Sequence, residues 1–145
     1  NNCILLDHIC RSNSINILTF LYENEFLKNN DFTVKCFNKA CRNGNFEVMK
    51  FIYENGLITY SYRALEKAIM SNNFDMVKYI HIRQISEDVN AYTIDTVCKS
   101  GNLNMLIYFR MFGHDKCTFY GLNKARIYQH SHIIKYIVEN NYVEN

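Results

Sequence analysis

Four residues near the end of the chain carry side chains that can bind a metal ion. They are His114 and Cys117, three positions apart, and His130 and His132, two positions apart. Zinc would require the four side chains to converge at about 2.0–2.3 Å in a tetrahedron, and their spacing matches no standard zinc finger. We therefore expect histidines in surface loops, with no bound metal and no cofactor.

The sequence lacks the short motifs that carry common reactions. It has no Gly-x-Ser-x-Gly, no glycine-rich phosphate loop and no His-Glu-x-x-His. The aspartate and glutamate residues are expected mostly at helix starts or on solvent-facing positions. We therefore expect a protein that is not an enzyme.

The six cysteines have no paired spacing and follow no secretion signal, which favours a reducing, intracellular setting. Cys10, Cys41 and Cys98 occupy one position of a repeat described below, so packing explains them. Cys3, Cys36 and Cys117 occupy unrelated positions. We interpret all six as structural residues.

Basic side chains recur at two positions of the same repeat, three residues apart and therefore neighbours on one helix. The residues are His8, Arg11, Lys39, Arg42, Lys67, Lys99 and Lys124. Stacked repeats would align them into a ladder on a concave face that could receive an acidic protein partner. A solvated helix face, balanced by Asp7, Glu66 and Asp95, is the simpler interpretation. Nucleic acid is a less favoured partner, because we expect no aromatic ladder on these helices to stack bases.

The composition is that of a folded chain with little net charge. Of 145 residues, 48% are hydrophobic and 21% are charged, and the formal charge is +2. No apolar run approaches the roughly 18 residues that a membrane span needs. Proline and tryptophan are absent while asparagine and isoleucine abound, a bias typical of an AT-rich genome.

An internal repeat organises the chain. Small or apolar residues, here called the anchor positions, recur 31, 28, 29 and 28 residues apart at Ile9, Ala40, Ala68, Val97 and Ala125. They define five units at about 4–31, 32–59, 60–88, 89–118 and 119–145, which form one array over residues 1–145. We expect this array to be part of a longer chain.

Each unit predicts two short helices joined by a tight turn. An apolar residue three positions before each anchor gives the first helix one apolar face. Four positions after the anchor stand Asn13, Gly44, Asn72, Gly101 and Gln129. Glycine and asparagine tolerate the left-handed conformation that ends a helix, so only Gln129 departs. Helices this short must stack to be stable, which predicts an all-α array of antiparallel helix pairs.

This pattern resembles the ankyrin repeat. Asn43-Gly44-Asn45-Phe46-Glu47-Val48-Met49-Lys50-Phe51-Ile52 is similar to the family's second helix, and Asp88-Val89-Asn90-Ala91 to its inter-repeat motif. The units lack the family's Thr-Pro-Leu-His entry and are four or five residues shorter than the usual length of about 33. The resemblance therefore implies an ankyrin-like solenoid with truncated fingers, similar to the short repeats of giant DNA viruses with AT-rich genomes.

The resemblance also implies a function. Ankyrin repeats act as scaffolds or adaptors that bind proteins through their concave face, so we expect a protein-interaction module, host-directed and in the host cytoplasm or virion if viral. The alternative is a structural or self-assembling component, such as a spacer or virion protein. In this family the asparagine equivalent to Asn90 can be hydroxylated, although a role in the turn is the simpler interpretation.

Overall fold

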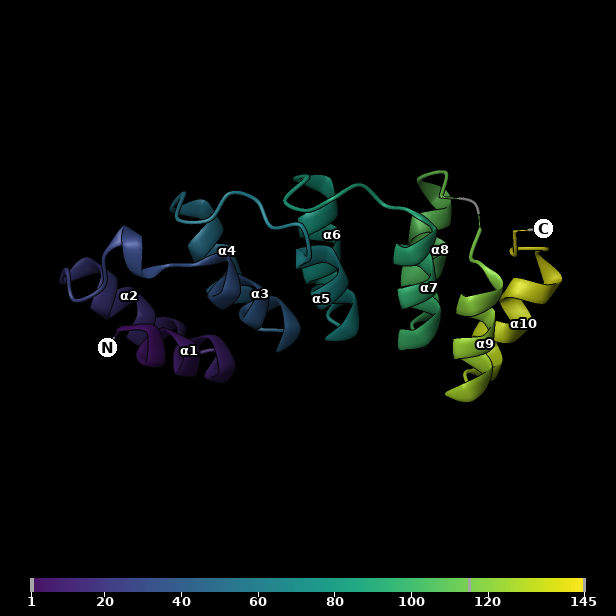
Figure 1. The fold of residues 1–145 in the computed structure, drawn as a ribbon, viewed down its shortest axis with the longest axis horizontal. Coiled ribbons are helices and arrows are strands. Elements are labelled where there is room, and N and C mark those ends of the chain that lie inside the picture. Colours follow the sequence, from purple (N-terminus) through teal and green to yellow (C-terminus); the bar gives the residue numbers. More distant parts are fainter. Residues whose placement is uncertain (1, 115, 145) are drawn as a thin grey trace. The chain divides into compact units, whose positions relative to one another are not determined.

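The computed structural model describes residues 2–114 and 116–144, and the regular structure in these ranges is helical (Figure 1). An isolated parallel bridge joins Cys117 to Val143, and these ranges contain no β-strand. The expected all-α class is confirmed. The elements are α1 (Asn2–Ser12), α2 (Ile15–Glu23), the 3₁₀ turn η1 (Asn29–Asp31), α3 (Val34–Arg42), α4 (Phe46–Glu54), α5 (Ala64–Met70), α6 (Phe74–Ile82), α7 (Ala91–Ser100), α8 (Leu103–Met111), α9 (Phe119–Ile127) and α10 (Ser131–Glu139).

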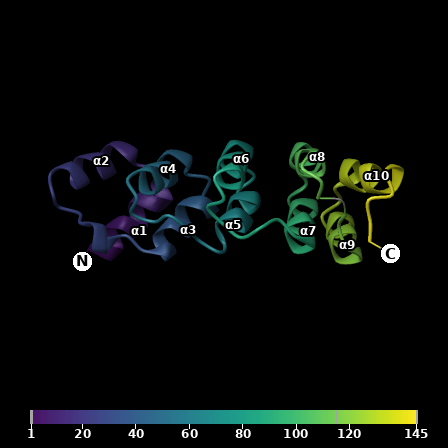
Figure 2. The ribbon, with the colours of Figure 1, turned by 90° about the horizontal axis from the view of Figure 1, so that it is seen from above.

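The chain divides into two compact units, Asn1–Glu87 with α1 to α6 and Asp88–Asn145 with α7 to α10. We call the odd-numbered elements first helices and the even-numbered ones second helices. In the first unit α1 contacts α3 and α3 contacts α5, while in the second unit α7 contacts α9. Each first helix also contacts the second helix that follows it. Within each unit the two sets form two layers (Figure 2).

The turns between paired helices confirm the predicted left-handed residue. All five positions have a positive φ: Asn13 (52°), Gly44 (71°), Asn72 (60°), Gly101 (77°) and Gln129 (58°). Gln129 therefore adopts the expected conformation despite its residue type. A second series of positive φ follows the second helices at Glu25, Gly56, Gln84, Gly113 and Asn141. These positions recur at the same intervals as the anchors, so the repeat extends to the backbone at both ends of each second helix.

The predicted apolar positions of the first helices form the core. The anchors are at most 3% exposed, and the residues three positions earlier are at most 5% exposed. The latter are Leu6, Phe37, Leu65, Ile94 and Leu122. Because the helices have only 7 to 11 residues, this burial rather than intrinsic propensity must stabilise them. Among the described residues, no helix has the length and apolar character that crossing a bilayer would require.

Candidate binding surface

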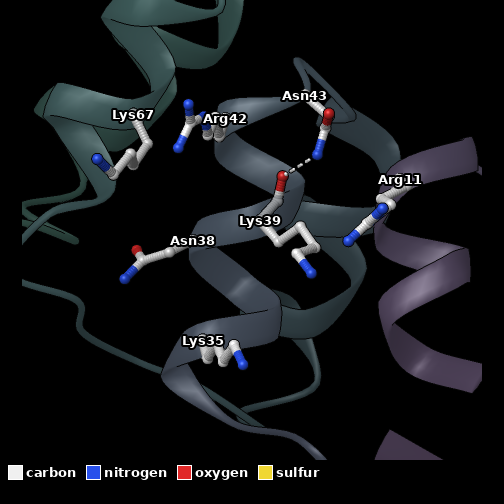
Figure 3. Close-up of a pocket in the computed structure, with 7 residues that line it drawn as sticks. All are labelled: Arg11, Lys35, Asn38, Lys39, Arg42, Asn43 and Lys67. Carbon is white, nitrogen blue, oxygen red and sulfur yellow. Dashed lines mark hydrogen bonds between the residues drawn. The ribbon is translucent and has the colours of Figure 1, made fainter. Parts of the chain in front are cut away.

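An open cleft of about 390 Å³ lies on the first helices of the unit Asn1–Glu87 (Figure 3). We call it the basic cleft. Its lining comes from α1, α3 with its C-cap, and α5, and consists of Arg11, Lys35, Asn38, Lys39, Arg42, Asn43 and Lys67. The spacing of the basic residues on α3 explains why they line the same cleft, because residues i, i+4 and i+7 share one face of a helix. Lys35, Lys39 and Arg42 have this spacing.

The structure brings together four of the seven basic residues predicted from the sequence. Arg11, Lys39, Arg42 and Lys67 line the basic cleft. His8 is exposed on α1 but does not belong to the lining, and Lys99 and Lys124 belong to the other unit. A ladder running through all five repeats stays a prediction.

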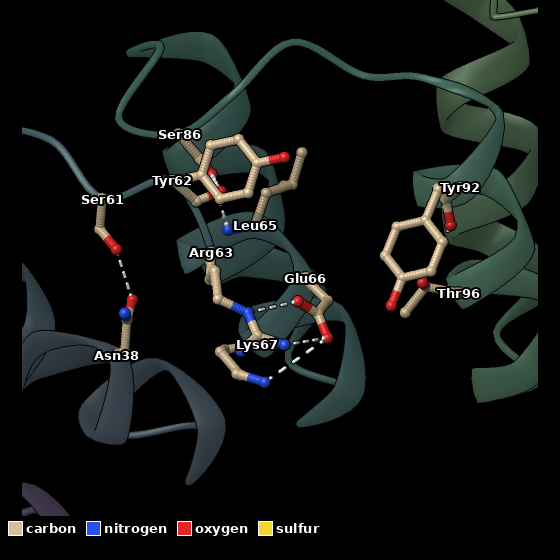
Figure 4. A network of polar contacts seen from close by, with 10 residues as sticks. All are labelled: Asn38, Ser61, Tyr62, Arg63, Leu65, Glu66, Lys67, Ser86, Tyr92 and Thr96. Atoms are coloured by element: carbon tan, nitrogen blue, oxygen red, sulfur yellow. Dashed lines mark hydrogen bonds and ion pairs between the residues drawn. The ribbon is translucent and has the colours of Figure 1, made fainter. Parts of the chain in front are cut away.

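Two carboxylates offset part of the positive charge. Asp7 pairs with both Lys39 and Arg11, the latter at 3.1 Å. Glu66 pairs with Arg63 at 3.1 Å and with Lys67 at 3.5 Å (Figure 4). Burial raises the pKa of the Glu66 carboxyl, but the Arg63 hydrogen bond and the charges of Lys67 and Arg63 outweigh it and lower the pKa below 4.5.

Lys35 and Arg42 are exposed, and among the described residues neither has an ion-pair partner. The five cationic side chains of the cleft thus outnumber the two carboxylates that pair with them. A surface with this surplus attracts anions, and the attraction weakens as salt is added.

Two asparagine amides lie among these cations. Asn38 accepts a hydrogen bond from the Ser61 hydroxyl at 2.6 Å (Figure 4), and the Asn43 amide donates to the Lys39 carbonyl at 2.8 Å (Figure 3). These bonds use the oxygen of Asn38 and the nitrogen of Asn43. The remaining donor of Asn38 and acceptor of Asn43 match the two hydrogen-bonding groups of a peptide backbone.

Lys35, Asn38 and Asn43 were not predicted from the sequence. The predicted basic residues occupy only two positions of the repeat, one before and two after the anchor. The i, i+4, i+7 series on α3 would have identified Lys35.

The predicted lysines of the second unit have aromatic neighbours. Lys99 Nζ lies 5.9 Å from the ring centroid of Tyr128, and Lys124 Nζ lies 4.9 Å from that of Tyr120. Tyr92 on α7 and Tyr120 on α9 are 55% and 56% exposed. The first helices of this unit thus carry two exposed tyrosines, and the expectation that they form no ladder for stacking bases stays a prediction. We call the surface formed by Tyr92, Lys99, Tyr120, Lys124 and Tyr128 the tyrosine face.

Two rings of the tyrosine face, those of Tyr120 and Tyr128, have partners of their own. Lys124 lies over one face of Tyr120, while Tyr128 has Lys99 over its ring and stacks on His130 with an interplanar angle of 19°. Cation–π contacts of this kind contribute about 0.5–1 kcal/mol at exposed sites. Stacked nucleic-acid bases would have to displace these partners.

Asp95 corrects one expectation. Instead of balancing charge on a solvated helix face, this residue is only 5% exposed. It accepts hydrogen bonds from the backbone N–H of Thr118 at 2.8 Å and from the Thr118 hydroxyl at 2.6 Å. A Cβ on Gly121 would lie 2.3 Å from Asp95 Oδ1. The absent side chain at Gly121 thus lets α9 approach this carboxylate.

The side chains of the four candidate metal ligands contact other groups of the protein. His130 Nε2 lies 3.0 Å from the Lys99 carbonyl oxygen, and His132 Nε2 lies 2.7 Å from that of Gly101. The Cys117 thiol donates to the Tyr142 carbonyl at 3.1 Å, and the His114 ring lies edge-on to Phe109. Within residues 2–114 and 116–144, no three histidine, cysteine, aspartate or glutamate side chains form a metal-binding group.

Asn90 has the structural role that its position suggested. It is the N-cap of α7, where its side-chain oxygen accepts from the Thr93 backbone N–H at 3.1 Å. The Asn90 N–H in turn donates to the Thr93 hydroxyl at 3.2 Å, which completes a capping box. Asn90 is exposed, and its hydroxylation stays a prediction.

Cys10, Cys41 and Cys98 are 0% exposed, which agrees with their interpretation as packing residues. Cys36 and Cys117 are also buried, whereas Cys3 is exposed. None of the six forms a disulfide bond with another described residue.

The chain was compared with known protein families, curated proteins and solved structures. Neither the scan against models of protein families, nor the search of curated proteins, nor the search of solved structures finds a match to the chain.

Proposed function

We propose that this chain is a non-catalytic protein-interaction module, an ankyrin-like solenoid of short repeats whose concave first-helix face binds an acidic segment of a partner protein. The observation that carries the proposal is the basic cleft, where Lys35 and Arg42 are exposed beside the paired Arg11, Lys39 and Lys67. The helix pairs that recur at near-constant intervals support the family assignment.

The chemistry of the cleft favours a polypeptide ligand. Its described lining consists of lysines, arginines and asparagines, side chains that donate hydrogen bonds to carboxylates. The amides of Asn38 and Asn43 suit a peptide backbone. The net charge of only +2 is small for a protein that tracks a phosphate backbone. A reducing, intracellular location fits six cysteines that form no disulfide among the described residues.

A labelled oligoglutamate peptide tests this proposal directly, with an oligoglutamine peptide of the same length as the reference. We expect the glutamate peptide to bind and the glutamine peptide to bind at least about tenfold more weakly, a difference of roughly 1.4 kcal/mol. The variant Lys35→Glu with Arg42→Glu should weaken binding by about tenfold or more, since neither residue has an ion pair to lose within the part of the chain that the structure describes.

The matched control makes the same charge change on the second helices, Lys50→Glu with Lys78→Glu. If it weakens binding as much as the cleft variant, the attraction is a property of net charge and not of the cleft. If the wild type binds both peptides equally, the proposal is wrong.

A structural or self-assembling role is the second candidate, and one observation favours it. Large apolar side chains are exposed on α2 and just after it, where Ile17, Phe20 and Phe26 are 52%, 59% and 61% exposed. Phe20 and Phe26 stack with ring centroids 6.4 Å apart. Such a patch is typical of a surface that packs against protein. Sedimentation should show dimers or larger species that Phe20→Ser with Phe26→Ser abolishes; a wild-type monomer at high concentration contradicts this role.

A further inference from the structure

Each unit contains one pair of hydrogen-bonded thiols. Cys10 on α1 pairs with Cys36 on α3, and Cys98 on α7 pairs with Cys117, just before α9. Each pair therefore connects two consecutive repeats. In the first unit the two helices that carry the thiols pack against each other.

Cys36 has the surroundings of a reactive cysteine. It is the third residue of α3, and its sulfur accepts a hydrogen bond from the Thr33 backbone N–H at 3.3 Å. The first turn of a helix stabilises a thiolate, because the peptide dipoles point their positive ends toward it. The hydrogen bond from Cys10, together with those from the Thr33 and Phe37 backbone, lowers the pKa of the Cys36 thiol to about 6. In its thiol form the proton is directed at the Thr33 carbonyl, 2.9 Å away.

Accessibility distinguishes Cys36 from the other buried cysteines. Its side chain is 7% exposed, whereas Cys10, Cys41, Cys98 and Cys117 are 0% exposed. Burial also raises the pKa of Cys41, which leaves that thiol protonated and unreactive. Among the described buried cysteines, Cys36 alone thus combines some solvent exposure with a lowered pKa.

We propose that Cys36 and Cys10 form a peroxide-responsive pair that closes a disulfide between α1 and α3. The Cys36 thiolate attacks one oxygen of a hydroperoxide; the O–O bond breaks, and the peroxide leaves as hydroxide or alkoxide while Cys36 becomes a sulfenic acid. The Cys10 sulfur then attacks the Cys36 sulfur and forms the S–S bond. The sulfenic hydroxyl leaves with the Cys10 proton as water, so the peroxide is reduced and two thiols are oxidised.

The disulfide would join helices that both line the basic cleft. Arg11 follows Cys10 directly and Lys35 precedes Cys36. A covalent bond draws the two sulfurs to about 2.05 Å and fixes the separation of α1 and α3. The proposed modification does not depend on the proposed function, since it can be detected without any ligand.

The second pair is an internal control. Cys98 and Cys117 are fully buried, and the Cys117 thiol donates a hydrogen bond to the Tyr142 carbonyl. In the folded protein, peroxide should therefore oxidise Cys10 and Cys36 first and leave Cys98 and Cys117 reduced.

The test treats the Cys3→Ser variant with hydrogen peroxide, alkylates the remaining thiols and digests the protein with trypsin without reducing agent. The Cys3 substitution removes the exposed thiol. We expect one cross-linked species that joins the peptides ending at Arg11 and Lys39, with a mass lower by two hydrogens than the sum of the two, and its loss on reduction. Cys41→Ser should leave the cross-link unchanged.

Cys10→Ser removes the second thiol, so Cys36 should accumulate as a sulfenic acid that dimedone labels; Cys36→Ser should show neither product. Circular dichroism establishes that each variant is folded, and Cys10→Ala replaces Cys10→Ser if the latter is not. Alkylation of both Cys10 and Cys36 after peroxide, or faster oxidation of Cys98 and Cys117, would overturn the proposal.

Discussion

The first helices of the two units share a backbone plan but present different chemistry at the same positions. On α3, the residues five and one before the anchor and two after it are basic, whereas on α7 they are Tyr92, Thr96 and Lys99. On α9 they are Tyr120, Lys124 and Ile127. Lys35 and Arg42 of the cleft have no ion pair with any described residue, while the lysines of the tyrosine face lie near aromatic rings. The residue types at these three positions thus set the chemistry of each first helix, whereas the anchors and the residues three positions before them form the core.

A buried contact between repeats shows the same division. Two positions before the anchor stand Asn38 in the first unit and Asp95 in the second, and each accepts from a hydroxyl at the entrance of the next first helix. The bond is neutral in the first unit, from Ser61 to Asn38. In the second unit it is charged and doubled, because Thr118 donates through both its N–H and its hydroxyl. We infer that the second unit depends more strongly on this contact.

Alanine substitutions at these equivalent positions should show the largest difference. Asp95→Ala leaves two donors of Thr118 without their charged acceptor, and we expect a loss of about 3 kcal/mol in the free energy of unfolding. Asn38→Ala removes one neutral bond and should cost about 1 kcal/mol. Urea denaturation measures both values. Equal losses would contradict the inferred difference.

The turn glycines give the next largest effect. Gly44 and Gly101 both have a left-handed φ, but a Cβ on Gly101 would lie 2.6 Å from the His130 ring, whereas on Gly44 the nearest atom is 3.6 Å away. Gly44→Ala should cost about 1 kcal/mol from backbone strain alone. Gly101→Ala should cost about 2 kcal/mol or more, because it also displaces the ring that contacts the Lys99 carbonyl. Thermal unfolding compares the two, and a smaller shift for Gly101→Ala would refute the steric argument.

Charge reversal on the tyrosine face should have a smaller effect on binding than reversal in the cleft. We expect Lys99→Glu with Lys124→Glu to weaken oligoglutamate binding by about twofold, the size of a general charge effect. Fluorescence anisotropy measures the change. A loss as large as that of the cleft variant would extend the binding surface to the second unit.

The smallest expected effect is a dependence of stability on pH. Because the pKa of Glu66 is lowered on folding, its ion pairs stabilise the protein above the unfolded value of 4.5. That contribution is lost as the pH falls through the lower, folded pKa. The Glu66→Gln variant should therefore lose less stability than the wild type between pH 5 and pH 3, by about 0.5 kcal/mol. Identical acid denaturation profiles would contradict the assignment.

Local features of the fold were predictable from the sequence, while contacts between repeats were not. The left-handed turns follow from Gly44, Gly101 and their asparagine equivalents, because few residue types adopt that conformation. The burial of Asp95 depends on Thr118, which is 23 residues away, and nothing in the local pattern of α7 indicates it. The adjacency of Cys10 and Cys36 likewise requires α1 to pack on α3.

The candidate site was predictable in part for the same reason. Arg11, Lys39, Arg42 and Lys67 were identified because they recur at two compared positions. The exposed Tyr92 and Tyr120 lie at a third position of the repeat, five residues before the anchor. The ion pair between Asp7 and Lys39 joins two repeats. The net positive charge of the basic cleft therefore depends on how the helices pack and does not follow from the sequence alone.

Mapping the oligoglutamate peptide onto the ¹⁵N-labelled chain by amide chemical shifts tests the central claim most directly. We predict shifts concentrated at Arg11, Asn38, Arg42 and Asn43, with the amides of α7 and α9 unaffected at the same peptide concentration. Shifts of equal size on both units, or confined to α7 and α9, would contradict the claim that the basic cleft is the binding site.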